Sequence, residues 1–444
     1  ESGEGRHASW TLSPEGLLQE STVNGYGTYE LVYQGDSRLK QVIHTDGEST
    51  RNYVIDRVEE GDLIIHTVTH PDGVEFEIWT TQAMRRIAKR WNTDDGTITL
   101  GYDDNGRVQE LTGPAGNVYR FDFDSAGRLV SILTPSPENS TDVRQVLSLD
   151  YNLDGQLLAV NNPDQTARIS YNYDEYGRVI EASGEDYQVG QFYSGVSGQL
   201  AGYSRVGLEP AESVDVDLNW QGELLTSMTY SGAVSGSVSY SYDDFFYRSS
   251  ETVSWSGGLR TVNTSYDSDG FLASRGDYSI TRAAGTEQQI EARVGDIRRT
   301  TTYNGFGEVT GESYDLVSTA EVLFSEAIVR NDVGQVSERE ETFMGTNQTI
   351  TYGYDGRRRL IGASAGGVSS AWDYDQNDNL TGTSHGASSE TFTYNLADQL
   401  ASSSEHAYSY DEKGQLRVRT ETGSGSERGF DYDAAGQLST VTME

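Results

Sequence analysis

The sequence predicts an all-β fold, a spiral of antiparallel β-hairpins that winds into a shell or tube. Three observations lead to this prediction. The composition favours turns and strands, with 49 Gly and 28 Tyr against 12 Phe, and Tyr adds area to a core while keeping a polar end. A phrase made of an aromatic residue, an aspartate, a glycine turn and an aliphatic residue recurs, as in FDFDSAGRL at 121–129. Short segments around each phrase alternate between apolar and polar residues, as half-buried strands do.

The recurring phrase organises the chain, because self-similarity at a fixed period is the signature of a repeat fold. Most repeats follow one another at steps of about 20 to 24 residues. An eroded repeat, VRNDVGQV, lies at 329–336. The anchoring aromatic residues of the repeats are Tyr102, Phe123, Tyr151, Tyr173, Tyr193, Trp220, Tyr242, Tyr266, Tyr303, Tyr354, Tyr374, Tyr394, Tyr410 and Tyr432.

The physical chemistry of one repeat can be followed in the segment that begins at Tyr102. The side chains of Asp103 and Asn105 can bond to nearby turn amides, and Gly106 can take the positive φ that a tight hairpin needs. A second turn at 112–116, TGPAG, closes the repeat. Each repeat is therefore expected to hold two short antiparallel strands and two turns.

One hairpin cannot bury its face alone, so the repeats must pair edge to edge into a continuous sheet, which curls because strands twist with a fixed hand. Residues 101–444 carry the regular repeats. Residues 1–100 carry degenerate ones, such as WTLSPEGLL and WNTDDGTITL, and are a candidate cap for one end of the array. No convincing linker separates the two regions.

The phrase Y-D-x-x-G-R-[LV], as in GYDDNGRV and YDEYGRV, resembles the YD-repeat proteins, also called RHS-repeat proteins. The resemblance covers most of residues 90–444 and, more weakly, 10–90. This family includes bacterial contact-dependent and insecticidal toxins and the extracellular teneurins. The resemblance implies a large β-shell around a cavity and a secreted or cell-surface location. The toxin shells enclose a C-terminal effector and carry an Asp-Pro self-cleavage motif, and this sequence contains no Asp-Pro, so self-cleavage does not carry over.

The bulk charge excludes several partners. The formal net charge is −37, which should repel nucleic acid and anionic membranes. Nearly all positive charge comes from Arg, because the chain has only three Lys. An acidic surface with few Lys is expected of a protein in a saline medium, and the alternative is that the charge only keeps the protein soluble. No apolar run is long enough to span a membrane as a helix. The chain has no Cys and starts without Met or a signal segment, which suggests a processed or trimmed chain.

The segment 79–91, WTTQAMRRIAKRW, combines cations with two Trp in an otherwise acidic protein. Arg forks match carboxylate and sulfate geometry, and Trp faces stack on sugar rings. One interpretation is a site for an acidic polysaccharide, and the other is that these cations pair with acidic residues across strands. The candidate binding residues are Trp79, Arg85, Arg86, Lys89, Arg90 and Trp91.

His66 and His70 lie in an alternating run, LIIHTVTH at 63–70. In a strand, residues four apart lie roughly 13 Å from each other, so the pair cannot chelate one metal ion. Either His is a candidate general base for β-elimination of a uronate polysaccharide. The alternative is that both are ordinary residues of a sheet face.

No cofactor is expected, apart from a weakly bound Ca²⁺ at partial calcium loops such as 373–378, where turn chemistry is the competing explanation. The sequence thus predicts a scaffold or encapsulating module that binds an enclosed or adjacent polypeptide. The alternative is a secreted lyase, or a binding protein, for an acidic uronate-containing or sulfated polysaccharide.

Overall fold

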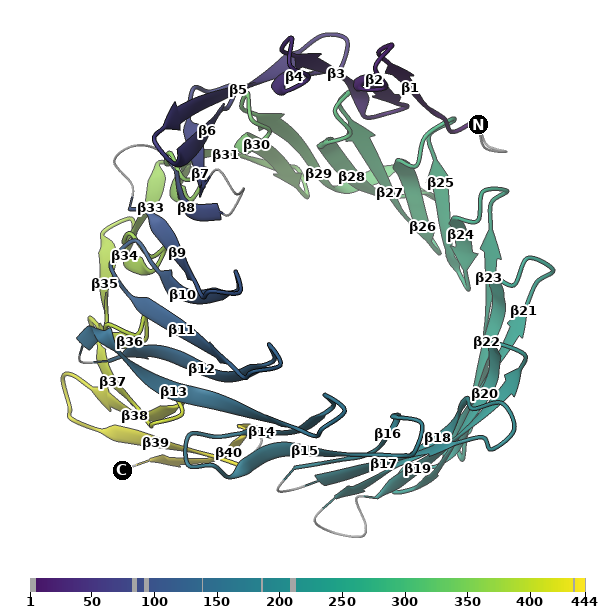
Figure 1. Ribbon diagram of the computed structural model, residues 1–444. Helices are drawn as coiled ribbons and strands as arrows, with labels where there is room; N and C mark the ends of the chain where they lie inside the picture. The colour runs from purple at the N-terminus through teal and green to yellow at the C-terminus, as the bar shows by residue number, and fades with distance from the viewer. Residues whose placement is uncertain are drawn as a thin grey trace. The chain divides into compact units, whose positions relative to one another are not determined.

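The computed structural model describes residues 5–81, 86–91, 96–137, 139–184, 187–207, 213–433 and 436–443. Within these ranges every regular element is a β-strand. No helix long and apolar enough to cross a membrane occurs in them. The predicted all-β array of antiparallel hairpins is therefore confirmed (Figure 1).

The strands follow one another with short connections. The first group is β1 (Ala8–Leu12), β2 (Leu18–Val23), β3 (Gly27–Tyr33), β4 (Leu39–Thr45), β5 (Thr50–Glu60), β6 (Leu63–Thr69), β7 (Glu75–Thr81), β8 (Arg86–Trp91), β9 (Ile98–Tyr102), β10 (Val108–Thr112), β11 (Val118–Phe123), β12 (Leu129–Ser136) and β13 (Asn139–Tyr151). The second group is β14 (Leu157–Asn161), β15 (Ala167–Tyr173), β16 (Val179–Ser183), β17 (Tyr187–Tyr193), β18 (Leu200–Gly207), β19 (Val214–Gln221), β20 (Leu224–Gly232), β21 (Gly236–Tyr242), β22 (Arg248–Trp255), β23 (Gly258–Tyr266), β24 (Leu272–Arg275), β25 (Tyr278–Arg282), β26 (Gln289–Val294) and β27 (Ile297–Tyr303). The third group is β28 (Val309–Leu316), β29 (Glu321–Arg330), β30 (Val336–Phe343), β31 (Thr346–Tyr354), β32 (Leu360–Ala365), β33 (Val368–Tyr374), β34 (Leu380–His385), β35 (Ser388–Tyr394), β36 (Leu400–Ser403), β37 (His406–Tyr410), β38 (Leu416–Glu421), β39 (Glu427–Tyr432) and β40 (Leu438–Met443).

Sequential strands pair in antiparallel fashion, and the predicted anchors stand at or next to the C-terminal ends of odd-numbered strands. The register shifts at the anchor itself, as between Asp122 and Phe123 or between Asn172 and Tyr173. We call the turn after each odd-numbered strand an anchor turn, and the turn after each even-numbered strand a return turn. Both kinds of turn were predicted from the segment that begins at Tyr102.

The anchor turn is held by its first residue. Asp103 Oδ1 accepts the backbone amides of Asn105 and Arg107, both at 2.9 Å, and Gly106 takes φ 81°, as the sequence predicted. The second carboxylate oxygen accepts Arg107 Nε at 2.6 Å. The carboxylate thus satisfies the turn and binds the cation four residues on.

The anchor aromatic joins its repeat to the previous one. Its polar end donates to the backbone carbonyl at the start of the preceding repeat's even-numbered strand, which gives a ladder of repeat-to-repeat bonds. The donor–acceptor pairs are Tyr33–Leu18, Tyr151–Leu129, Tyr173–Leu157, Tyr193–Val179, Trp220–Leu200, Tyr242–Leu225, Tyr303–Gln289, Tyr354–Val336, Tyr374–Leu360 and Tyr410–Leu400.

Arginine completes this ladder. The Arg128 guanidinium carbon lies 4.8 Å from the centre of the Tyr151 ring in the next repeat, and Arg178 lies 4.2 Å from that of Tyr193. Such cation–π contacts stabilise stacked repeats. The anchor aromatic residues therefore form an inter-repeat ladder.

The ladder also contains repeats that the Tyr pattern does not reveal. Arg282 Nη1 donates to Leu272 O at 2.7 Å, and Arg330 Nη2 donates to Val309 O at 3.1 Å. Each Arg takes the place of an anchor aromatic. A repeat anchored on Arg282 explains the long step between Tyr266 and Tyr303.

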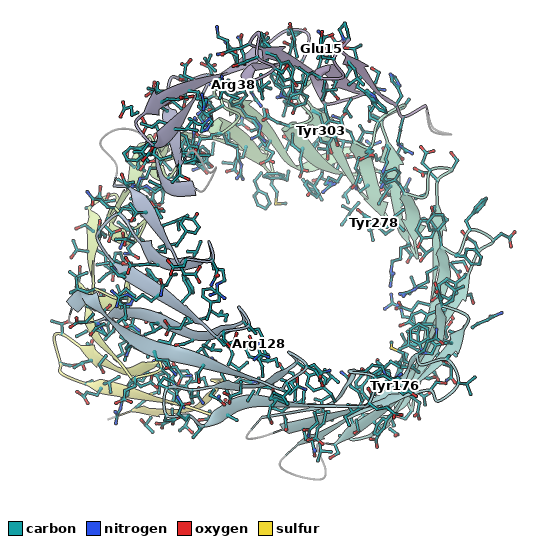
Figure 2. All side chains as sticks on the ribbon, in the orientation of Figure 1. Glu15, Arg38, Arg128, Tyr176, Tyr278 and Tyr303 are labelled. Atoms are coloured by element: carbon teal, nitrogen blue, oxygen red, sulfur yellow. The ribbon has the colours of Figure 1, made fainter. Side chains whose placement is uncertain are left out.

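The core is thin. Among the described residues, the buried hydrophobic side chains are Ile64, Ala88, Val118, Val216 and Ala292, and Pro135 is also fully buried. Most anchors and aliphatic residues are only half-buried, and side chains project on both sides of the strands (Figure 2). Lateral contacts between repeats, rather than a second covering layer, therefore supply most of the burial.

The chain forms two compact units, each built from an early and a late set of hairpins. Unit 1 joins Glu1–Thr99 with Asn263–Ser389, and unit 2 joins Leu100–Val262 with Glu390–Glu444. In unit 1, β2–β5 lie beside β27–β30 (Figure 1). The first hundred residues therefore pack against late repeats, and their role as a cap stays a prediction.

The anchor turn generates a pH prediction, because it occurs in a charged and a neutral version. The amide of Arg107 and then its guanidinium hold the pKa of Asp103 below its ordinary value, and Arg128 does the same for Asp124. A lowered carboxyl pKa contributes stability that is present above the unfolded pKa of about 3.9 and is lost as the pH falls through the folded pKa. The neutral version keeps the same amide bonds with Asn and Gln, as in Asn152–Gln156.

We therefore expect the double variant Asp124→Asn with Arg128→Gln to unfold near the wild-type urea midpoint at pH 7. Its midpoint should fall less than that of the wild type between pH 5 and pH 2.5. Urea unfolding followed by circular dichroism measures both. The control Asp124→Ala, which removes the amide bonds, should be destabilised at every pH. Equal destabilisation of the double variant and Asp124→Ala would contradict this account of the turn.

Candidate functional site

The sequence-predicted site centres on strands β5–β8 of unit 1. Backbone register places Arg57, His66, Ile78 and Lys89 opposite one another in a single row across the four strands. Residue Arg85 lies outside the described residues, as do the side chains of Arg86, Lys89, Arg90 and Trp91. The register therefore brings the positions of His66 and Lys89 into one row, and the site as a whole stays a prediction.

The two predicted His differ in their surroundings. Burial and then the nearby Arg57 lower the pKa of His66, so its imidazole is neutral at pH 7. His70 has left the strand and opens the return turn after β6, where its amide donates to Val74 O at 2.9 Å. Its ring meets the edge of Tyr53 at 5.5 Å, and burial and then Arg358 lower its pKa. His70 thus belongs to a turn rather than to the row of His66.

Trp79 is engaged within its own strand. Its indole Nε1 donates to Glu77 Oε2 at 2.8 Å, and its backbone pairs with Ile65 and Ala88. The bond lies within one strand, so it does not test the alternative that the cations of this segment pair with acidic residues across strands, which stays a prediction.

The expected calcium loop is an anchor turn. Asp375 Oδ1 accepts the amides of Asn377 and Asn379 at 2.8 and 2.9 Å. Asp378, at φ 70°, accepts Arg357 and Arg359. Within the described ranges no group of three or more His, Asp or Glu could hold a metal ion. Bound Ca²⁺ stays a prediction.

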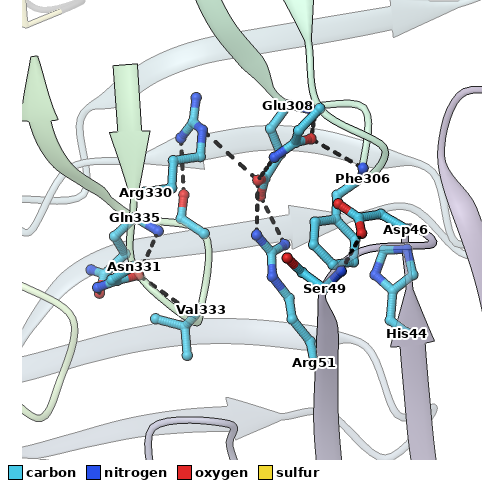
Figure 3. A network of polar contacts seen from close by, with 12 residues as sticks. His44, Asp46, Ser49, Arg51, Phe306, Glu308, Arg330, Asn331, Val333 and Gln335 are labelled. Carbon is cyan, nitrogen blue, oxygen red and sulfur yellow. Dashed lines mark hydrogen bonds and ion pairs between the residues drawn. The ribbon is translucent and has the colours of Figure 1, made fainter. Parts of the chain in front are cut away.

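A second polar cluster, absent from the sequence predictions, forms where early and late hairpins of unit 1 meet (Figure 3). Arg51 of β5 makes two parallel bonds to Glu308, Nη1–Oε1 at 2.9 Å and Nη2–Oε2 at 2.8 Å. The same guanidinium lies 4.0 Å from the centre of the Phe306 ring. Burial disfavours the charge on Glu308, but the bonds from Arg51 and Asn304 outweigh it and lower its pKa.

His44 of β4 packs against the same late turn. It is 7% exposed, stacks on Tyr29 at 3.8 Å and meets the edge of Phe306 at 4.7 Å. Its Nε2 lies 2.8 Å from Tyr26 O, and because a carbonyl can only accept, this nitrogen carries the proton. Gly307 is needed here, since a Cβ would lie 2.4 Å from the Tyr26 ring. The cluster therefore holds the early hairpins of unit 1, the layer before residue 100, against its late hairpins, the layer after residue 262.

The same arrangement recurs in both units, with anchor turns of late repeats on return turns of early repeats. In unit 1, Gln288 donates to Gly25 O and Arg358 forms two bonds to Asp72. In unit 2, the 3%-exposed Asn117 donates to Leu396 O at 2.7 Å. Tyr119 donates to Asp398, and burial followed by this carboxylate raises the pKa of Tyr119 to about 12. The docked layers are 257 to 286 residues apart in sequence.

One concave feature lies beside the N-terminal strand. A hollow of about 440 Å³ is lined by Arg6, Asn24, Tyr26 and Phe271, among others. Arg6 is bound to Asp267, Asp269 and the carbonyl of Thr286. Its cation is therefore engaged in joining early and late hairpins.

Comparison with known proteins agrees with the repeat geometry. The family model described as Teneurin YD-shell matches residues 82–444. The chain belongs to the teneurin YD-shell family. Teneurin-m of Drosophila melanogaster is 32% identical to this YD-shell chain over 80 residues, which are 18% of the chain and 3% of that protein.

Among the solved structures that are similar to the YD-shell chain, two examples are 13% identical to it. The crystal structure of TcdB2-TccC3 matches with a TM-score of 0.37, covering 99% of this chain and 32% of that one. The Photorhabdus luminescens Tc holotoxin pore matches with a TM-score of 0.36, covering 99% and 30%. The chain therefore spans about a third of those chains. The predicted YD-repeat relationship is confirmed by the family match.

The docking cluster generates a stability prediction. Replacing Arg51 by Ala leaves the half-buried carboxylate of Glu308 without its bidentate partner, so we expect the free energy of unfolding to fall by about 2 kcal/mol. Urea unfolding of the full chain measures this. Arg38→Ala is the matched control, because Arg38 is 52% exposed beside an exposed Asp36 and should change little. Equal effects of the two variants would show that layer docking does not depend on the Arg51–Glu308 pair.

Proposed function

We propose that this YD-shell chain acts outside the cell as an encapsulating scaffold, with another polypeptide as its enclosed or adjacent partner. Membership of the YD-shell family supports the proposal. The observation that carries it is the use of the chemistry that recurs in the repeats: the Asp, Arg and aromatic side chains bind turn amides, each other and neighbouring repeats. These side chains hold the repeats of the sheet together, as expected of a scaffold.

The half-buried sheet also fits this role. Aliphatic and aromatic side chains along the strands remain partly exposed, as the thin core requires. Apolar surface of this kind is stabilised when a partner covers it. The acidic surface, with a net charge of −37, favours solubility in a saline medium and a partner other than nucleic acid.

Small-angle X-ray scattering of the purified chain tests the scaffold proposal. An enclosing wall should give a pair-distance distribution shifted toward the maximum dimension, compared with a filled particle of the same mass. A polypeptide bound inside should also resist a protease that digests it when free. A distribution typical of a filled particle, with no protection of any co-purifying polypeptide, would contradict encapsulation.

The second candidate function is a lyase for an acidic, uronate-containing or sulfated polysaccharide. One observation favours it: His66 is neutral at pH 7 and shares a cross-strand row with Arg57 and the position of Lys89. In β-elimination, a neutral His removes the C5 proton while a cation neutralises the uronate carboxylate. The C4–O bond to the leaving sugar then breaks as the C4–C5 double bond forms, and the leaving oxygen takes up a proton from water.

The lyase candidate predicts shortened polymer and new ultraviolet absorbance from unsaturated ends when the chain is incubated with uronate-bearing polysaccharides in saline buffer. His66→Ala should lower that rate by about 10²-fold or more, since a general base contributes about that much. His385→Ala, on β34, is the matched control. Retention of intact polysaccharide without cleavage would indicate a binding protein, and no interaction across the panel would leave only the scaffold.

A further inference from the structure

Where an anchor turn docks on a return turn, the third residue of the anchor turn can pack against the neighbouring hairpins. In the turn that begins at Asn304, this residue is Phe306, and it packs beneath Arg51 and against His44 of the early layer. An aromatic residue at this place thus inserts into a return turn of the neighbouring layer.

Other anchor turns expose an apolar residue to solvent at this same third position. Tyr176 and Phe245 occupy the third position of the turns that begin at Asp174 and Asp243, and they are 75% and 79% exposed. Val196 holds the corresponding place in the turn after β17 and is fully exposed. We call these residues, with the exposed neighbours Leu153 and Phe246, the anchor-turn row. All five belong to unit 2.

One residue of this row has a left-handed backbone conformation. Phe246 has φ 66°, at the turn position that Gly occupies at Gly106 and Gly177 and that Arg358 and Asp378 occupy in other anchor turns. A bulky residue there is strained, and such strain concentrates at functional positions. An exposed Phe pair on a strained turn therefore points to a binding role.

A complementary apolar row lies in and beside the return turns of the late repeats in unit 1. Phe343 and Met344 are 61% and 68% exposed, and Met344 has φ 46°. This return-turn row consists of Val294, Ile297, Val322, Phe343 and Met344. It differs from the docked return turns of the early repeats, which present polar groups such as Asn24, Asp72 and Asn117.

We propose that the anchor-turn row of one molecule docks on the return-turn row of a second copy of this chain. The contact repeats, between molecules, the anchor-on-return docking that each unit already uses between its own layers. Apolar anchor-turn residues would meet apolar residues of the second copy, as the aromatic ring of Phe306 inserts among early-hairpin side chains within the chain. Because two different surfaces meet, the association is head-to-tail rather than symmetric. The net charge of −37 disfavours an anionic membrane as the occupant.

Sedimentation velocity of the full chain over a concentration series tests this proposal. We expect the average mass to rise with concentration, and more strongly at high salt, because salt screens the repulsion between acidic molecules. Tyr176→Ser with Phe245→Ser, and separately Phe343→Ser with Met344→Ser, should each weaken self-association by at least about tenfold. Leu438→Ser, an exposed apolar residue of β40 outside both rows, is the matched control.

Mixing the two double variants distinguishes this contact from others. Each variant lacks one row and keeps the other, so an equimolar mixture should form a dimer and no larger species. Circular dichroism and thermal unfolding establish that both variants fold. A wild type that stays monomeric, variants that associate like the wild type, or a mixture that does not recover the dimer would each overturn the proposal. Flotation of a monomeric wild type with zwitterionic vesicles would instead assign the rows to a membrane surface.

Discussion

The structure depends on the anchor turn. One Asp or Asn side chain accepts two amides of a tight turn, and the aromatic residue before it donates to the preceding repeat. The first contact makes a hairpin, and the second makes the hairpin part of a sheet. Because single hairpins are marginal in water, neither contact would suffice alone. The Arg that follows the turn links them, since it binds the Asp and lies over the next aromatic ring.

The small number of fully buried side chains explains the amino-acid composition. A wall one sheet thick buries few side chains completely, so the chain uses Tyr, which packs its ring and still satisfies its hydroxyl at a half-buried position. Arg can replace it, as at Arg282 and Arg330, because a long side chain with an apolar stem reaches the same carbonyl. The same logic makes Asn–Gln an acceptable substitute for Asp–Arg. From one repeat to the next, the pattern of hydrogen bonds therefore varies less than the residue types that form it.

The docking of layers is a separate level of organisation. It uses residues outside the YD phrase, such as Arg51, Asp72 and Asn117, which receive anchor turns more than 250 residues away in sequence. Turns that meet a neighbouring hairpin use polar side chains and the aromatic ring of Phe306, whereas two rows of residues at other turns are apolar and exposed. The exposure of the apolar turn residues thus separates contacts made within the chain from surfaces suited to a partner.

The sequence alone determined the strands, the anchor turns and most anchors, because hairpin signals are local: an Asp, a Gly with positive φ and alternating neighbours lie within a few residues of one another. It also determined the family, through the repetition of that phrase. Only the tertiary structure decided that His70 opens a docked return turn, that Arg282 and Arg330 act as anchors, and that Arg51 clamps Glu308. These outcomes depend on which hairpin lies beside which after hundreds of residues of accumulated twist, and no local pattern encodes that distance.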